Sequence, residues 1–232
     1  MMISDIEIEV LRLSLKIATW AVLTSLPFGI GMAFLLSRRR FPGRFLLDGI
    51  VHLPLVIPPV AVGYILLLVL GRQGLLGGWL YDVFGLTLVF TWQGAALAAA
   101  VMAFPLMVRA MRLSLDSVDQ RIEAAARTLG ASPLRVFLTI TLPLITPGIL
   151  TGAVLAFARA LGEFGATITF VSNIAGETRT LPIALYSLLQ APGSEDAALR
   201  IVVISIALAL LALLISELLA RRVARRLTGE AP

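Results

Sequence analysis

The sequence is poor in the residues that most often carry enzyme chemistry. It contains no cysteine, which excludes a disulfide framework, a thiolate metal site and a cysteine nucleophile. It contains one histidine, His52, which excludes a histidine-clustered metal centre. We therefore predict no catalytic residues, no metal ligands and no cofactor bound by this chain.

Charged residues are scarce as well. They make up 14% of the 232 residues, whereas ordinary soluble domains carry roughly 25%. Hydrophobic residues make up 59%. A deficit of charge along the whole chain is typical of burial in lipid. The sequence therefore predicts an all-α, polytopic membrane protein that forms one domain over residues 1–232, with its core at 10–220.

Five apolar runs are long enough to cross a bilayer, which takes about 20 mostly apolar residues. They lie near residues 14–36, 46–70, 86–108, 136–158 and 199–220. Pro54, Pro58 and Pro59 predict a kink in the second run. The connection 159–198 is too apolar for a plain loop and too interrupted for a clean span. Two alternatives stay open for it: a segment that dips partway into the bilayer, and a sixth, discontinuous span.

Basic residues are concentrated on alternate connections. Thirteen of the 19 follow the first, third and fifth runs: Arg38, Arg39, Arg40, Arg44, Arg109, Arg112, Arg121, Arg127, Arg135, Arg221, Arg222, Arg225 and Arg226. Positive charge of this kind marks the cytoplasmic side of a membrane protein. We therefore expect the amino terminus outside and the carboxyl terminus inside, and no nucleic acid as partner.

A short polar helix interrupts the apolar pattern between the third and fourth runs. Ser117 and Gln120 have the spacing of a capping box at its start. Gly130 can supply the left-handed residue that ends a helix. Ser132 and Pro133 then predict the start of the next helix, because a capping side chain is followed by proline at the first helical position.

This helix has two distinct faces. Its apolar residues recur at helical spacing: Val118, Ile122, Ala125 and Leu129. Its charged residues occupy another face, and we predict an ion pair between Glu123 and Arg127, four residues apart. A solvated connector helix is the simplest interpretation. A DNA-binding helix-turn-helix is excluded, because its second helix would enter the membrane.

The stretch EAAARTLGASPLRVFLTITLP, residues 123–143, resembles a cytoplasmic pattern of permease subunits in binding-protein-dependent ABC importers. That pattern is Glu-Ala-Ala, a glycine four residues later, and Ile-x-Leu-Pro after nine more. The matching residues are Ala125, Ala126, Gly130, Ile140, Leu142 and Pro143. The position of the pattern's glutamate holds Ala124, and Glu123 lies one residue earlier.

The resemblance implies that residues 116–132 form a coupling helix region that docks into a separate ATPase subunit. The implied coupling residues are Glu123, Ala124, Ala125, Ala126 and Gly130. The chain has no Gly-x-x-x-x-Gly-Lys-Ser/Thr phosphate loop, so ATP and Mg²⁺ would bind in the partner, and this chain is not itself an enzyme. The resemblance further implies a homodimer in the bacterial inner membrane, two ATPase subunits and an outer oxyanion-binding protein.

Three further stretches resemble the oxyanion branch of these permeases, and the molybdate permeases most of all. They are HLPLVIPPVAVGY (52–64), FARALGEFGATITFVSN (157–173) and GETRTLPIALY (176–186). The resemblance implies import of molybdate by alternating access. Tungstate and sulfate or thiosulfate stay open as alternative substrates.

An oxyanion path needs hydrogen-bond donors that do not trap the ion. Arg159 is the basic group close to the end of the fourth run, and Glu163 follows four residues later, within reach of an ion pair. That pair has two interpretations, a structural link at the helix end or an anion gate. Thr167 and Thr169 offer hydroxyl donors beside it.

The rival function is a stand-alone secondary transporter. It would require ionisable groups inside the spans for ion coupling. Asp48, Arg159 and Glu217 lie at span ends instead, which argues against this class.

Overall fold

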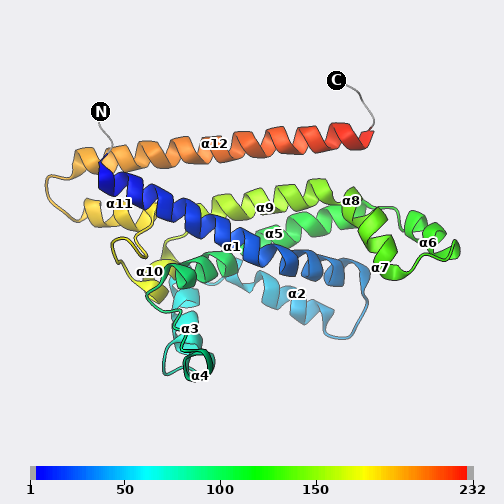
Figure 1. Cartoon of the computed structure of the whole chain (residues 1–232), viewed down its shortest axis with the longest axis horizontal. Helices are drawn as coiled ribbons and strands as arrows, with labels where there is room; N and C mark the ends of the chain where they lie inside the picture. The colour runs from blue at the N-terminus through cyan, green and yellow to red at the C-terminus, as the bar shows by residue number, and fades with distance from the viewer. Residues whose placement is uncertain (1–3, 229–232) are drawn as a thin grey trace.

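The computed structural model describes residues 4–228, and its regular elements are helices (Figure 1). Helices α1 (Asp5–Arg38) and α5 (Trp92–Ser117) are each long and apolar enough to cross a membrane. So is the Glu195–Ile215 part of α12 (Glu195–Thr228). Two bent helix pairs raise the number of candidate spans to as many as five. The predicted all-α, polytopic class is confirmed.

The second candidate span is bent far more sharply than a kinked helix. It consists of α2 (Arg44–His52), the short 3₁₀ helix η1 (Leu53–Leu55) and α3 (Pro59–Leu70), and the two halves meet at 111°. Pro58 and Pro59 stand at the bend, where their rings exclude a continuous helix. The predicted kink is confirmed, and it divides the candidate span 46–70 into two separate helical segments. Helix α3 and the following α4 (Leu75–Phe84) extend away from the bundle (Figure 1).

The fourth candidate span is also broken, by 66°. It begins as α7 (Pro133–Val136), continues as a π-helical turn, η2 (Phe137–Thr141), and then as α8 (Leu142–Leu144) and α9 (Thr146–Leu161). Proline within a span removes backbone donors, and π turns mark local changes in helical winding. The span is therefore a regular helix, α9, preceded by an irregular segment that follows the short polar helix predicted between the third and fourth runs.

Helix α5 is the centre of the bundle and packs against both α1 and α9. Gly148 and Gly152 on α9 are four residues apart, the spacing that lets helices approach closely in membranes. A Cβ atom added to Gly152 would lie 2.9 Å from the carbonyl oxygen of Met107 on α5. One added to Gly148 would overlap the side chain of Ser114. The contact between α5 and α9 therefore depends on these two glycines.

The connection between the fourth and fifth spans folds into two short helices, α10 (Gly165–Val171) and α11 (Leu181–Leu189). Helix α10 packs against α3 and α5, and Phe170 and Ile183 are fully buried. At 1.5 Å per residue, neither helix approaches the ~30 Å of a hydrocarbon core. Within residues 4–228 there is accordingly no sixth candidate span.

The first and last helices are joined at the end of the molecule opposite α6 (Gln120–Thr128) (Figure 1). Arg200 Nε of α12 lies 2.8 Å from Oε1 of the buried Glu7 of α1. The Ser14 hydroxyl of α1 accepts a hydrogen bond of 2.8 Å from the Leu181 backbone N–H. The side chains of four tail arginines used to predict orientation lie outside the described residues: Arg221, Arg222, Arg225 and Arg226.

Candidate functional site

Helix α6 projects from one end of the bundle, between α5 and α7 (Figure 1). Its N-cap is Asp119, whose carboxylate accepts from the backbone N–H of Arg121 at 2.9 Å. The predicted capping box of Ser117 and Gln120 is therefore wrong. The Ser117 hydroxyl instead donates to the carbonyl of Ser114 at 2.7 Å, because α5 continues through Ser117.

The end of α6 follows the prediction. Gly130 has φ +86°, a left-handed conformation that other residues adopt only at a cost. The next helix, α7, starts three residues later at Pro133, and the hydroxyl of its N-cap Ser132 accepts from the Arg135 N–H at 3.3 Å. A tight turn thus returns the chain from α6 to the bundle.

The apolar face of α6 points outward. Ile122 is 48% exposed and Leu129 is 88% exposed. Ala124 and Ala125 are exposed as well, and Ala126 is half-buried. Small and apolar side chains that protrude together outside a protein's own core are typical of a surface that contacts another protein.

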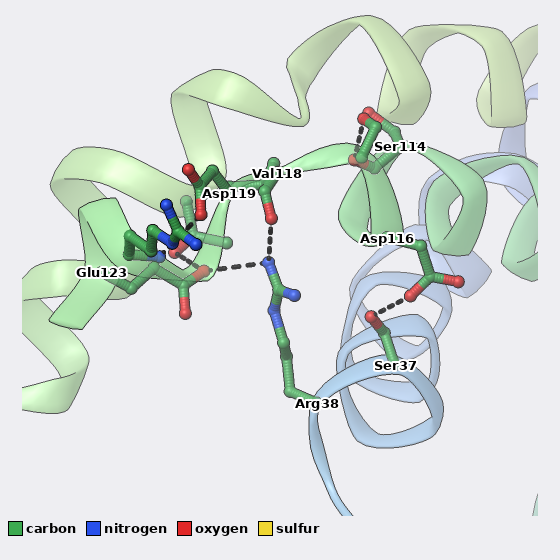
Figure 2. A network of polar contacts seen from close by, with 10 residues as sticks. Ser37, Arg38, Ser114, Asp116, Val118, Asp119 and Glu123 are labelled. Carbon is green, nitrogen blue, oxygen red and sulfur yellow. Dashed lines mark hydrogen bonds and ion pairs between the residues drawn. The ribbon is translucent and has the colours of Figure 1, made fainter.

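One residue of the charged face, Glu123, points inward and is buried, whereas Asp119 and Arg127 are exposed. Glu123 Oε1 lies 3.1 Å from Nη2 of Arg38, at the end of α1, and accepts a hydrogen bond of 3.0 Å from the Thr141 hydroxyl. Arg38 also donates to the carbonyl of Val118 at 3.4 Å (Figure 2). The predicted partner, Arg127, is therefore wrong, and the carboxylate is used for contacts within the chain.

Sequence reasoning missed Arg38 and Thr141 as partners of Glu123. Arg38 lies 85 residues before Glu123 and was counted only among the arginines that set orientation. Helical spacing finds partners three or four residues away, so it carries no signal for this pair. Helix α6 is short and lies beside the bundle, so contacts with residues distant in the sequence determine which of its side chains face inward.

The second group of predicted residues lies at the junction of α9 and α10. The predicted ion pair is confirmed: Arg159 Nη1 lies 2.7 Å from Glu163 Oε2. Glu163 is only 2% exposed, and its other oxygen accepts from the backbone N–H of Ala166 at 2.8 Å. Glu163 therefore links the end of α9 to the first turn of α10.

Thr167 and Thr169 lie in α10 and bond to its backbone. The Thr167 hydroxyl donates to the carbonyl of Phe164 at 2.9 Å, and that of Thr169 donates to Gly165 at 2.8 Å. Thr167 is buried and Thr169 is half-buried. Both hydroxyl protons are thus engaged in this structure, so donation to an anion would require each hydroxyl to give up its bond to the backbone carbonyl.

Replacing Glu163 by alanine is expected to destabilise the protein by about 3–5 kcal/mol, the usual effect of removing one partner of a buried ion pair. The change leaves Arg159 without its carboxylate and the Ala166 N–H without its acceptor. Thermal unfolding of the detergent-solubilised protein measures the loss. Glu195→Ala removes an exposed carboxylate from the start of α12 and should alter stability by less than about 0.5 kcal/mol. Equal unfolding temperatures for the two variants would contradict the linking role.

The polar residues of these two sites form ion pairs and hydrogen bonds within the chain. Among residues 4–228, no group of three His, Asp or Glu side chains could hold a metal ion.

The chain belongs to the family described as binding-protein-dependent transport system inner membrane components, whose model matches residues 25–228. Proteins of this family are permease subunits of ABC importers. Over 221 residues the chain is 64% identical to the molybdenum transport system permease protein ModB of Escherichia coli (strain K12), covering 95% of this chain and 96% of that protein. The ModB protein of Haemophilus influenzae is 56% identical over the same length, with the same coverage.

A solved structure supports the fold independently. The inward-facing MetNI methionine ABC transporter matches 95% of this chain and 99% of its own chain, with a TM-score of 0.74 and 17% identity. At that identity the match concerns the fold alone. The chain is thus a multi-pass inner-membrane permease of the ABC importer class, a transport subunit rather than an enzyme.

Proposed function

We propose that this chain is the permease subunit of a molybdate importer driven by a separate ATPase subunit. The single observation that carries the substrate is the 64% identity to a molybdenum transport permease over nearly the whole of both chains. The match covers 95% of this chain, so the aligned region includes the two sites described above. Tungstate and sulfate, anions of similar shape and charge, are the alternatives that the experiment must separate.

ATP hydrolysis in the partner subunit would act on this chain through its contact with α6. Its exposed Ile122 and Leu129 offer an apolar surface to the ATPase subunit, and Ala124 and Ala125 leave room for close approach. The chain lacks a phosphate-binding loop, so ATP and Mg²⁺ would bind in that partner. Its cycle would move the spans between inward-open and outward-open arrangements as rigid bodies.

The assembly would be a homodimer with two ATPase subunits. Two-fold pairing is the commonest closed symmetry, and it places two copies of α6 on the same side of the membrane. The arginines of the first and third connections support a cytoplasmic location for that side. The amino terminus would then lie outside, where an oxyanion-binding protein delivers its anion.

The test is ATP hydrolysis by the reconstituted complex in liposomes. Molybdate-loaded binding protein should stimulate hydrolysis at least about tenfold more than binding protein presented with sulfate, a difference of roughly 1.4 kcal/mol in coupling. Equal stimulation by sulfate would show that the importer does not distinguish the two anions and would refute the assignment to molybdate. Uptake of molybdate by this chain alone, driven by an ion gradient and independent of ATP, would refute the ABC mechanism.

A further inference from the structure

We propose that Arg38, Glu123 and Thr141 form a clamp that positions the coupling helix against the first and fourth spans, so that a displacement of α6 reaches both. The inference rests on the proposed docking of the ATPase subunit at α6. It assigns Glu123 an indirect role: the residue positions the docking surface from inside and does not touch the partner.

The burial of the clamp supports this role. The side chains of Arg38 and Glu123 are 8% and 10% exposed, and their closest atoms lie 3.1 Å apart. Helix α6 has nine residues, and isolated helices of that length are marginal in water. Its orientation must therefore come from tertiary contacts, and Glu123 is its buried residue. Loss of the carboxylate would leave the outward face of α6 without a fixed direction.

The clamp also reaches the segment where the fourth span changes direction. Thr141 is the last residue of the π-helical turn η2, it is 1% exposed, and its hydroxyl donates to Glu123. Five residues later α9 begins, bent 66° from the segment before it. Bends at π turns and prolines are where a helix can change its angle. A displaced Glu123 would therefore pull on the joint of the fourth span.

On the other side the clamp holds the end of α1 to the α5–α6 junction. Arg38 donates to the carbonyl of Val118, the residue that follows the end of α5 (Figure 2). The preceding residue, Ser37, donates its hydroxyl hydrogen to the Asp116 carboxylate at 2.5 Å. The first span is thus attached at two points to the chain that enters α6, and both points would move with it.

A buried ion pair alone does not imply this role, because replacing such a pair by apolar residues of similar size is often neutral for stability. That property supplies the test. The double variant R38M/E123M removes the directional contacts without leaving a lone buried charge. The matched control is E7M/R200M, which removes the ion pair between the buried Glu7 and the half-buried Arg200, on distant helices at the opposite end of the molecule. The parent complex and both variants are assembled with ATPase subunits and reconstituted in liposomes.

The measured quantity is the ratio of ATP hydrolysis with and without molybdate-loaded binding protein, per assembled complex. We expect this ratio to be at least about tenfold lower in R38M/E123M than in the parent, since coupling between sites is typically worth 5–150-fold. In E7M/R200M the ratio should stay within about twofold of the parent's. A parent-like ratio for R38M/E123M would overturn the clamp while leaving the proposed function intact. A parent complex without stimulation would overturn the proposed function and the clamp with it.

Should R38M/E123M fail to assemble, the variant Glu123→Gln decides the question. Glutamine preserves the shape of the side chain and an oxygen for the Thr141 hydroxyl, and it removes the charge that holds Arg38. A ratio below about a third of the parent's would support the clamp, and a ratio equal to the parent's would overturn it.

Discussion

Replacing Leu129 by aspartate should separate this chain from its ATPase partner and leave the chain itself folded. Leu129 is 88% exposed, so its replacement removes almost no contact within the chain. In a docked complex, the leucine would contribute about 2 kcal/mol of apolar burial. A carboxylate buried without a partner would cost several kcal/mol more. The affinity for the ATPase subunit should therefore fall at least about 100-fold.

The measurement is binding of the purified ATPase subunit to the detergent-solubilised permease. Leu189→Asp is the matched control, because Leu189 is 71% exposed and closes α11 at the opposite end of the molecule. That variant should bind the ATPase subunit like the parent. Undiminished binding by Leu129→Asp would show that the exposed face of α6 is not the docking surface.

Gly152→Val is expected to prevent the bundle from forming. A Cβ at this position lies 2.9 Å from the Met107 carbonyl oxygen and 3.3 Å from Cγ of Met111, and the two methyl groups of valine add further overlap. The carbonyl belongs to the backbone of α5 and cannot move without the helix. Separating α5 from α9 would cost about 3 kcal/mol or more, a large share of the stability of a domain.

Size-exclusion chromatography of the solubilised protein measures the outcome: Gly152→Val should give aggregate and little monodisperse protein. Gly31→Val is the control, because a Cβ at Gly31 of α1 meets no atom within 4 Å. Valine is also a better helix former than glycine, so this variant should behave like the parent. A monodisperse Gly152→Val protein would show that the α5–α9 contact is not close.

Composition and hydrophobic runs predict the class and the number of candidate spans because lipid imposes a length and an apolarity on every crossing segment. They do not predict the 111° bend of the second span. Pro58 and Pro59 predict a break in the helix, but the angle between its two halves depends on the elements that each half packs against. Here α3 packs on α10, which follows it by a hundred residues.

Local signals near α6 have the same limit. Gly130 and Ser132 were predicted correctly, because a left-handed residue and a cap depend on neighbours within a few residues. Periodicity separates an apolar stripe from a charged one, but it does not decide which residue of the helix faces the bundle. That choice follows from Arg38, which holds Glu123 inside and so turns Leu129 outward.

The same limit applies to the junction of α9 and α10. The spacing of Arg159 and Glu163 predicts their ion pair, since side chains four residues apart can meet, and the pair forms although α9 ends at Leu161. It does not predict that the two threonine hydroxyls donate to the backbone of α10. Their geometry depends on the start of α10 at Gly165, where Glu163 accepts from the first turn.

The pairing of Glu7 with Arg200 sets an order of events during synthesis. The two residues are 193 positions apart, and the arginine belongs to the last helix. Ribosomes add roughly 5–20 residues per second, so Arg200 is synthesised on the order of ten seconds or more after Glu7. Closure of this end of the bundle is therefore a late step of biogenesis, completed only when the final helix has left the ribosome and reached the first.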